Sequence, residues 1–127
     1  MTTLRDDSEL PDYCAFIRET VSSAEILHVL GDIDISSIGH FERALDDTVR
    51  PARPLVIDLT TCDYIGAAGF ASLVRTHRAL GKGMRVAVSS EGIPARLFSL
   101  LESHARFFIA GSIEGALHPP RLDARAF

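Results

Sequence analysis

The alternation of hydrophobic and polar residues predicts five β-strands in this chain. Apolar and polar side chains alternate from Tyr13 to Thr20, and a second apolar stretch runs from Ala24 to Leu30. The serines between the two stretches are typical of a tight turn, so these strands should form an antiparallel hairpin. Three further short apolar runs predict strands over residues 54–59, 84–88 and 107–109.

Apolar residues that recur every three or four positions predict about four helices, over residues 38–49, 66–80, 90–101 and 112–117. Ser37 ends the loop before the first helix and is expected to cap it, as Ser112 is expected to cap the last. The second helix should end before Gly81, and its periodicity places Phe70 on the buried side.

This order of elements, β-β-α-β-α-β-α-β-α, predicts an α/β fold. Strands that alternate with helices build a mostly parallel sheet, and the opening hairpin makes the five-stranded sheet mixed. With 127 residues and 46% hydrophobic content, the chain fits one domain. We expect that domain over residues 13–117, with flexible tails at 1–12 and 118–127.

Charge and hydropathy narrow the class of protein. The formal net charge of -4 provides no basic field for nucleic acid, so we expect none as a partner. The polar first residues do not resemble a signal peptide, and no apolar run approaches the roughly 20 residues that span a bilayer. The sequence therefore predicts a cytoplasmic protein without membrane insertion.

The sequence shows no catalytic or metal-binding apparatus. The five histidines lack metal-ligand spacing, and neither a nucleophile motif nor a phosphate-binding loop is present. We therefore expect no enzyme, no cofactor and no metal. Cys14 and Cys62 are far apart and outside any CxxC motif, so we expect two reduced, partly buried thiols, with a redox role for the pair left open.

The start of the second predicted helix is the most informative segment. Residues 66–69 read Gly-Ala-Ala-Gly, so the first amides of this helix should be accessible to a partner or an anion. The alternative is that the small residues serve packing against Leu59 and Ile65. Thr60 and Thr61 just before this segment are expected to brace the turn.

Three segments in this order resemble the STAS family, the fold of the bacterial anti-sigma factor antagonists: 31–34 (Gly-Asp-Ile-Asp), 55–59 (Leu-Val-Ile-Asp-Leu) and 65–70 (Ile-Gly-Ala-Ala-Gly-Phe). The likeness continues through residues 85–88 and 95–98 and covers about 13–117. It implies a non-catalytic regulatory binding module. The implied partner is an anti-sigma factor, or a related protein of the histidine-kinase ATPase fold.

In that family the second helix usually starts Asp-Ser-Ser-Gly, and the partner kinase phosphorylates the serine after the aspartate. Ala67 stands at this phosphoacceptor position and Gly66 at the acid, so the resemblance implies a docking surface without the phosphoswitch. The partner-binding residues that the resemblance implies are Asp34, Ser36, Ser37, Gly66, Ala67, Ala68 and Gly69.

Other interpretations stay open. Asp58 ends a central strand, as the phosphoaccepting aspartate of a receiver domain does, but the acidic pair and the late lysine of that fold are missing. Asp58 is therefore expected to brace the strand end. A STAS-type regulatory subunit of a transport system or signalling complex is the alternative function. The oligomeric state, a homodimer included, is left open.

Overall fold

The computed structural model of the chain describes residues 2–3, 14–80, 83–89 and 108–119. Its strands are β1 (Thr2–Thr3), β2 (Ala15–Thr20), β3 (Glu25–Leu30), β4 (Leu55–Thr61), β5 (Met84–Val88) and β6 (Phe108–Ala110). Its helices are α1 (Ile38–Thr48), α2 (Ala67–Leu80) and α4 (Ile113–Leu117). The helix predicted over residues 90–101 lies outside the described residues.

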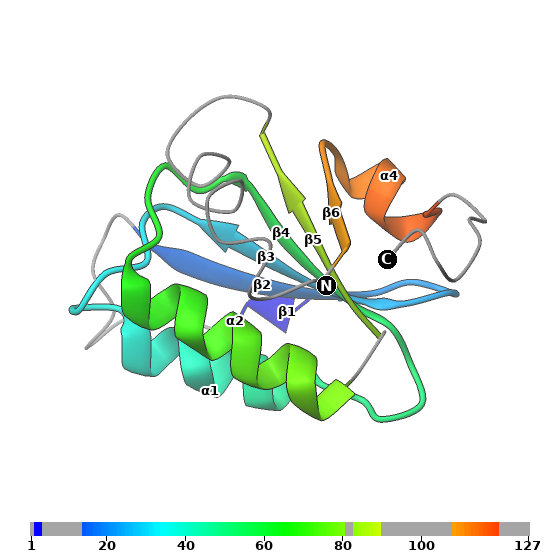
Figure 1. Ribbon diagram of the computed structural model, residues 1–127, viewed down its shortest axis with the longest axis horizontal. Helices are drawn as coiled ribbons and strands as arrows, with labels where there is room; N and C mark the ends of the chain where they lie inside the picture. Colours follow the sequence, from blue (N-terminus) through cyan, green and yellow to red (C-terminus); the bar gives the residue numbers. More distant parts are fainter. Residues whose placement is uncertain (1, 4–13, 81–82, 90–107, 120–127) are drawn as a thin grey trace.

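The strands form one mixed sheet in which the order in space is the order along the chain, from β1 to β6 (Figure 1). β2 and β3 are antiparallel, and their turn is closed by a 3.0 Å hydrogen bond from the Val21 amide to the Ala24 carbonyl. From β3 to β6 every pairing is parallel. The predicted mixed α/β fold is confirmed, and β1 adds a two-residue antiparallel edge that was not predicted.

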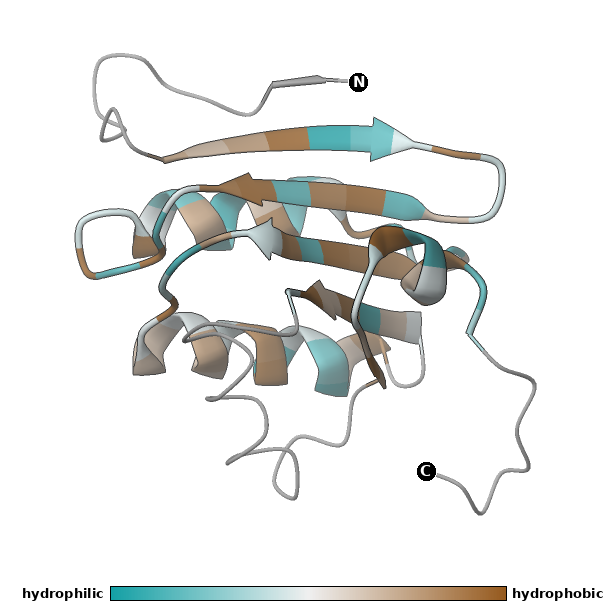
Figure 2. Cartoon of the chain, turned by 90° about the horizontal axis from the view of Figure 1, so that it is seen from above, coloured by the Kyte–Doolittle hydropathy of each residue, from teal (hydrophilic) through white to brown (hydrophobic). Residues whose placement is uncertain are grey.

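The helices cover the two faces of the sheet unequally. α1 and α2 lie side by side against one face, and α4 packs on the other (Figures 1 and 2). Strand alternation assigns side chains to the two faces: Phe16, Leu27 and Ile57 join the larger core under α1 and α2, whereas Ile26, Val56 and Ala87 meet α4. Among the described helices, none has the length and apolar character to cross a membrane.

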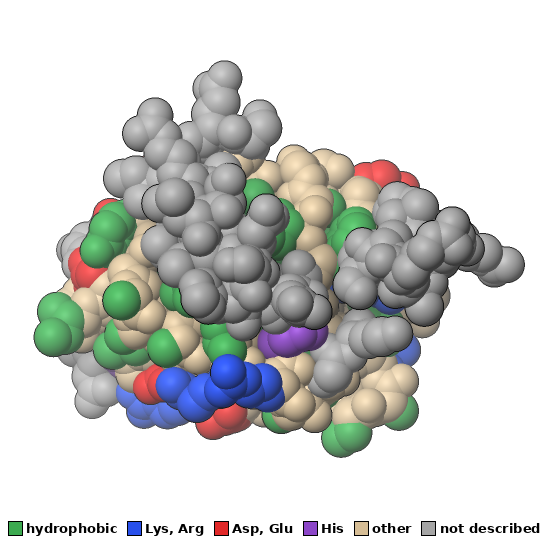
Figure 3. All heavy atoms as spheres, viewed as in Figure 1, with side chains coloured by type: hydrophobic (Ala, Val, Ile, Leu, Met, Phe, Trp, Pro, Cys, Tyr) green, Lys and Arg blue, Asp and Glu red, His purple; other side chains and the backbone are tan. Residues whose placement is uncertain are grey.

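The outer sides of α1 and α2 carry charges of both signs. Figure 3 shows basic and acidic side chains next to one another at the lower edge, over these two helices. Arg75 of α2 pairs there with Glu42 of α1, and the Ser72 hydroxyl donates to the same carboxylate at 3.0 Å. This exposed network links the two helices across their surface.

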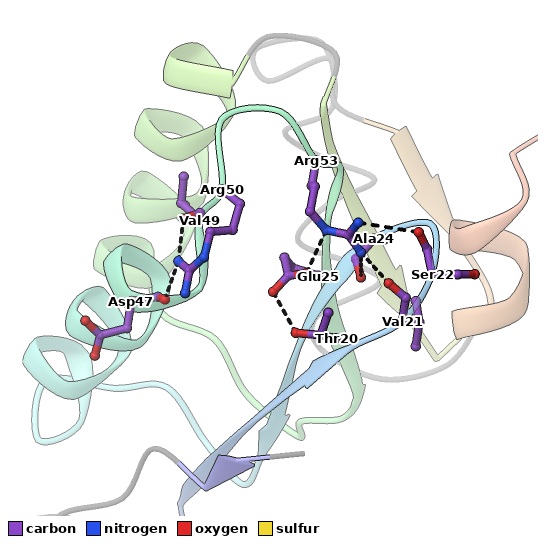
Figure 4. Close-up of polar contacts among 9 residues, drawn as sticks. All are labelled: Thr20, Val21, Ser22, Ala24, Glu25, Asp47, Val49, Arg50 and Arg53. Atoms are coloured by element: carbon purple, nitrogen blue, oxygen red, sulfur yellow. Dashed lines mark hydrogen bonds and ion pairs between the residues drawn. The ribbon is translucent and has the colours of Figure 1, made fainter.

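Arginines tie together the end of the sheet where the parallel strands begin (Figure 4). The Arg53 guanidinium donates to Glu25 at 2.8 Å and to the Ala24 carbonyl at 2.9 Å, which holds the β2–β3 hairpin against the start of β4. Arg18 and Arg50 donate to the Asp47 carbonyl at 2.8 and 2.9 Å and so satisfy the last turn of α1. Structural contacts fix this end of the fold, which lies opposite to the carboxyl ends of the parallel strands.

Candidate functional site

Two loops meet where β3 and β4 end, and they are the segments that the family resemblance singled out. The β3–α1 loop covers residues 31–37 and the β4–α2 loop residues 62–66. Ile33 and Ile65 form an isolated parallel bridge between them. The Ile33 amide donates to the Tyr64 carbonyl at 2.8 Å, and the Gly66 amide donates to the Ile33 carbonyl at 2.9 Å. The prediction of accessible amides is therefore wrong for Gly66, because its amide joins the loops.

Hydrogen bonds within the β3–α1 loop fix its shape. Asp34 Oδ1 accepts from the Ser36 amide at 2.9 Å and from the Ser36 hydroxyl at 2.6 Å. The Ser37 hydroxyl donates to the Asp32 carbonyl at 3.0 Å and accepts from the Asp34 amide at 3.1 Å. Ser37 is buried and makes no side-chain cap on α1, so the predicted cap is wrong: its hydroxyl is engaged by the preceding loop.

The first turn of α2 is exposed on one side and tightly packed on the other. Ala67 and Ala68 are exposed, and Gly66 is half-buried. Gly69 is buried, and a Cβ added there would lie 2.8 Å from both Ile33 Cγ2 and Ile65 Cγ1. The packing explanation for small residues therefore holds at Gly69, which faces the bridge between the loops and not the surface.

Two exposed hydrophobic side chains at this site were missed by the sequence reasoning. Ile35 is 93% exposed at the β3–α1 loop, and Tyr64 is 41% exposed beside α2. A Cβ added at Gly66 would lie 3.3 Å from Tyr64 Oη, so the tyrosine covers the side-chain position that is empty at Gly66. The signal for Ile35 was available, because it is an isoleucine between an aspartate and two serines.

We call residues 34–36, 64 and 66–68 the joined-loop surface. Of the seven residues that the resemblance implied, it contains Asp34, Ser36, Gly66, Ala67 and Ala68. The other two, Ser37 and Gly69, lie beneath it and hold its shape.

Asp58 lies on the α4 face of the sheet, in a chain of polar contacts across three strands. Its Oδ2 is 2.6 Å from His28 Nδ1, and His28 Nε2 is 2.8 Å from Glu19 Oε1. Its other oxygen accepts from the Thr60 amide at 2.9 Å and from the Thr60 hydroxyl at 2.6 Å. The expectation that Asp58 ends its strand is wrong, because β4 continues to Thr61 and Asp58 is paired with both neighbouring strands. Both of its oxygens are engaged, which does not favour a phosphoacceptor role.

These contacts change the ionisation of His28 and Asp58. The hydrogen bond to Asp58 raises the pKa of His28 and outweighs the opposing effect of burial; Glu19 adds to the rise. Burial alone would raise the pKa of Asp58, but the hydrogen bonds from His28 and Thr60 prevail and hold it below its usual value. The imidazolium form, which donates from both ring nitrogens, therefore suits this position.

The stability of the protein should depend on pH through this pair. Because the folded pKa of His28 is raised, its contribution is full below about pH 6.5 and is lost as the pH rises through the folded pKa. Because the folded pKa of Asp58 is lowered, its contribution is full above about pH 4 and is lost as the pH falls. Urea unfolding across this range should show the pair's contribution at its maximum between the two limits. A His28→Gln variant with the same pH profile as wild type would contradict this assignment.

The threonine and cysteine side chains near the site have structural contacts. The Thr61 hydroxyl donates to the Val29 carbonyl at 3.1 Å, and the Thr60 hydroxyl donates to Asp58. Both threonines brace the chain, but they do so as the last residues of β4 and not in a turn, because this strand runs to Thr61 and not to residue 59 as predicted. Cys14 and Cys62 are free, buried thiols. Burial raises the pKa of Cys62 to about 11 and also raises that of Cys14, which disfavours the reactive thiolate. A redox role for this pair stays a prediction.

Comparisons of this chain with family models and with solved structures give consistent results. A family model described as Mlab, STAS domain, matches residues 18–104. Among solved structures, the chain is similar to an anti-sigma factor antagonist from Mycobacterium paratuberculosis, with 27% sequence identity and a TM-score of 0.75 over 86% of this chain and 95% of that one. A comparison with curated proteins gives no match.

Two further structures share the fold at lower identity. One is from Thermotoga maritima, provisionally assigned as an anti-sigma factor antagonist, with 17% identity and a TM-score of 0.64 over 80% of this chain and 91% of that one. The other is the anti-sigma factor antagonist SpoIIAA in its unphosphorylated form, with 13% identity and a TM-score of 0.54 over 79% of this chain and 91% of that one. At these identities the likeness shows the fold alone.

Proposed function

This chain belongs to the STAS domain family, and from that premise we propose that it is a non-catalytic regulatory module that binds an anti-sigma factor. The proposed partner has the histidine-kinase ATPase fold, and the proposed contact is the joined-loop surface. The structural similarity to the mycobacterial antagonist supports this assignment.

The proposal is supported chiefly by the hydrogen bonds that join the β3–α1 loop to the β4–α2 loop. Residues far apart in the sequence, Asp34 and Ser36 on the β3–α1 loop and Ala67 and Ala68 in the first turn of α2, flank a hydrogen-bonded bridge. Ala67 and Ala68 are exposed and have small side chains, so a partner can approach the first turn of α2 closely. A rigid surface of this kind loses little conformational entropy on binding, because no loop has to become ordered.

The proposed module lacks the family's phosphoswitch at the start of α2. A phosphate adds about -1.5 to -2 charge and would repel a partner at this position. Ala67 and Ala68 have no hydroxyl to accept it, and Tyr64 covers the place of the missing acid at Gly66. Release of the partner would therefore depend on its concentration or on another protein.

Incubation with a candidate anti-sigma kinase and ATP should leave residues 66–69 without phosphate. Thr60 and Thr61 should stay unmodified as well, because their hydroxyls donate to Asp58 and to the Val29 carbonyl. Intact-mass and peptide mass spectrometry measure the result, with a STAS protein that has the usual serine as the positive control. Phosphate mapped to either threonine would contradict the proposal that this protein lacks a phosphoswitch.

The substitution Ala67→Glu should weaken binding to the partner by at least about 1 kcal/mol, because it places a buried charge in the proposed contact. Ala52→Glu is the matched control: Ala52 is also exposed, but it lies at the other end of the sheet, near Arg53. Calorimetric titration of both variants gives the two affinities. Equal affinities for both would place the interface elsewhere.

A regulatory subunit of a transport system is the second candidate. What favours it is the lack of any hydroxyl at residues 67–68, which leaves a kinase nothing to modify at this position. In that case the chain would bind a transporter ATPase through the same surface. Neighbouring genes separate the two functions, since sigma factor and anti-sigma genes accompany one and transporter genes the other.

A further inference from the structure

We infer that Ile35 and Tyr64 form a two-point apolar anchor, and that the partner receives it in an apolar pocket rimmed by lysine or arginine side chains. This inference rests on the proposed function and specifies the chemistry of the partner's receiving site. Both side chains of the anchor belong to this chain's own loops.

Exposure sets these two side chains apart. Among the residues that the structure describes, Ile35 and Tyr64 are the large hydrophobic side chains that are exposed, at 93% and 41%. Figure 3 shows hydrophobic atoms reaching the surface at the left end of the molecule, where Figure 1 draws the loop between β3 and α1. A single exposed isoleucine is ordinary, but here two such side chains come from two segments that are bonded together.

The loop that carries Ile35 is held rigidly. The carboxylate of Asp34 binds Ser36 on the far side of Ile35, and the buried Ser37 hydroxyl bonds back to Asp32. Polar contacts on both sides therefore fix the backbone that presents the isoleucine. An apolar side chain on a fixed turn loses little entropy on binding, which is the property of an interface anchor.

Tyr64 is the second side chain of the anchor, and its hydroxyl gives that side chain a polar end. Its ring lies over Gly66, and its carbonyl accepts from the Ile33 amide at 2.8 Å, so the Ile65 bridge also fixes its backbone. Ala67 and Ala68 lie exposed beside it. Tyrosine gives a large contact area for few rotatable bonds, and its hydroxyl tolerates a wet rim.

Charge identifies the kind of surface that fits. Residues 31–37 and 62–71 contain Asp32, Asp34 and Asp63 and no lysine or arginine. Asp63 is exposed and Asp32 and Asp34 are half-buried, so the segments that carry the anchor are acidic and would attract a basic rim and speed its association. A second copy of this chain would bring the same carboxylates together, which disfavours self-association through this face.

The first test separates the contribution of apolar contact by Ile35 to partner affinity from the contribution of its shape. Ile35→Val and Ile35→Thr give side chains of nearly the same shape, with a methyl group in valine where threonine has a hydroxyl. Because Ile35 is exposed, neither substitution should alter folding. Kinase-fold anti-sigma factors encoded in the same genome are purified, and their affinities are measured by calorimetry. We expect a loss of about tenfold or more for Ile35→Thr and about threefold or less for Ile35→Val. Tyr64→Ala should lose about tenfold, and Tyr64→Phe little.

The second test addresses the rim. Asp63→Asn should slow association with the same anti-sigma factor, and raising the salt from about 50 to about 500 mM should slow the wild type in the same way. Ala52→Glu, at the opposite end, should leave the rate unchanged. If neither Asp63→Asn nor the added salt changes the association rate, the proposed basic rim on the partner is refuted.

The outcomes distinguish this inference from the proposed function. If no kinase-fold anti-sigma factor binds the wild type, the proposed function fails and the anchor falls with it. If the wild type binds and Ala67→Glu weakens binding while Ile35→Thr does not, the surface stands and the anchor alone is refuted. Sedimentation that shows a wild-type dimer dissociated by Ile35→Thr would assign the anchor to a second copy and refute the basic partner.

Discussion

Replacing Asp58 by alanine should lower the free energy of unfolding by about 3 kcal/mol near pH 5.5, where His28 and Asp58 are both charged. The carboxylate is 6% exposed and His28 17% exposed, so water cannot readily replace the lost contact. The variant removes both acceptor oxygens of Asp58, Oδ2 from the His28 Nδ1–H and Oδ1 from the Thr60 amide. Urea unfolding monitored by circular dichroism measures the change.

Three comparisons make this result specific. Asp58→Asn keeps the shape and one acceptor oxygen, so it should cost less, about 1 to 2 kcal/mol. Asp63→Ala removes an exposed aspartate and should change stability by less than about 0.5 kcal/mol. The penalty for Asp58→Ala should shrink above the pKa of His28, when the imidazole becomes neutral. A penalty below about 1 kcal/mol at pH 5.5 would mean that the carboxylate contributes little.

The substitution Gly69→Ala should destabilise the protein by about 2 kcal/mol, although alanine normally favours helices. The added Cβ would lie 2.8 Å from carbon atoms close to the backbones of Ile33 and Ile65, and β-branched side chains cannot turn away freely. Relief requires the bridge between the two loops to widen. The same variant should therefore also weaken partner binding.

Gly39→Ala is the control for this prediction, because Gly39 lies in the first turn of α1 as Gly69 lies in that of α2. A Cβ at Gly39 would meet nothing within 4 Å, so alanine there should stabilise the fold by up to about 1 kcal/mol. Thermal or urea unfolding of the two variants should show changes of opposite sign. A gain at both positions would show that the bridge accommodates the methyl group.

Local patterns in the sequence were sufficient for most of the fold. Phe70 lies in the core as the helical periodicity predicts, and the Ser112 side chain accepts from the Gly115 amide as an N-cap. These features depend on neighbours within one turn of chain, and so the sequence reveals them. Ser37 makes no side-chain cap because its hydroxyl oxygen accepts from the Asp34 amide of the preceding loop, and not from an amide of α1, while its hydrogen goes to the Asp32 carbonyl.

The contacts that shape the candidate site depend on register between distant strands. His28 pairs with Asp58 because β3 and β4 are aligned at these residues, and no local pattern fixes that alignment. The same holds for the Ile33–Ile65 bridge, which decides that Gly69 faces inward and that Tyr64 covers Gly66. The family resemblance located the segments, but it could not tell which of their residues reach the surface.

The sequential order of the strands has a consequence for synthesis. Each strand from β2 to β6 pairs with the one before it, so no strand must be inserted between two that are already paired. A chain that emerges from its amino terminus can therefore extend the sheet in one direction. The joined-loop surface is complete at Ala68, in the first turn of α2, and so precedes β5, β6 and α4 in the chain. We expect this surface to be encoded whole in the first part of the chain to leave the ribosome, with β5, β6 and α4 added later as its support.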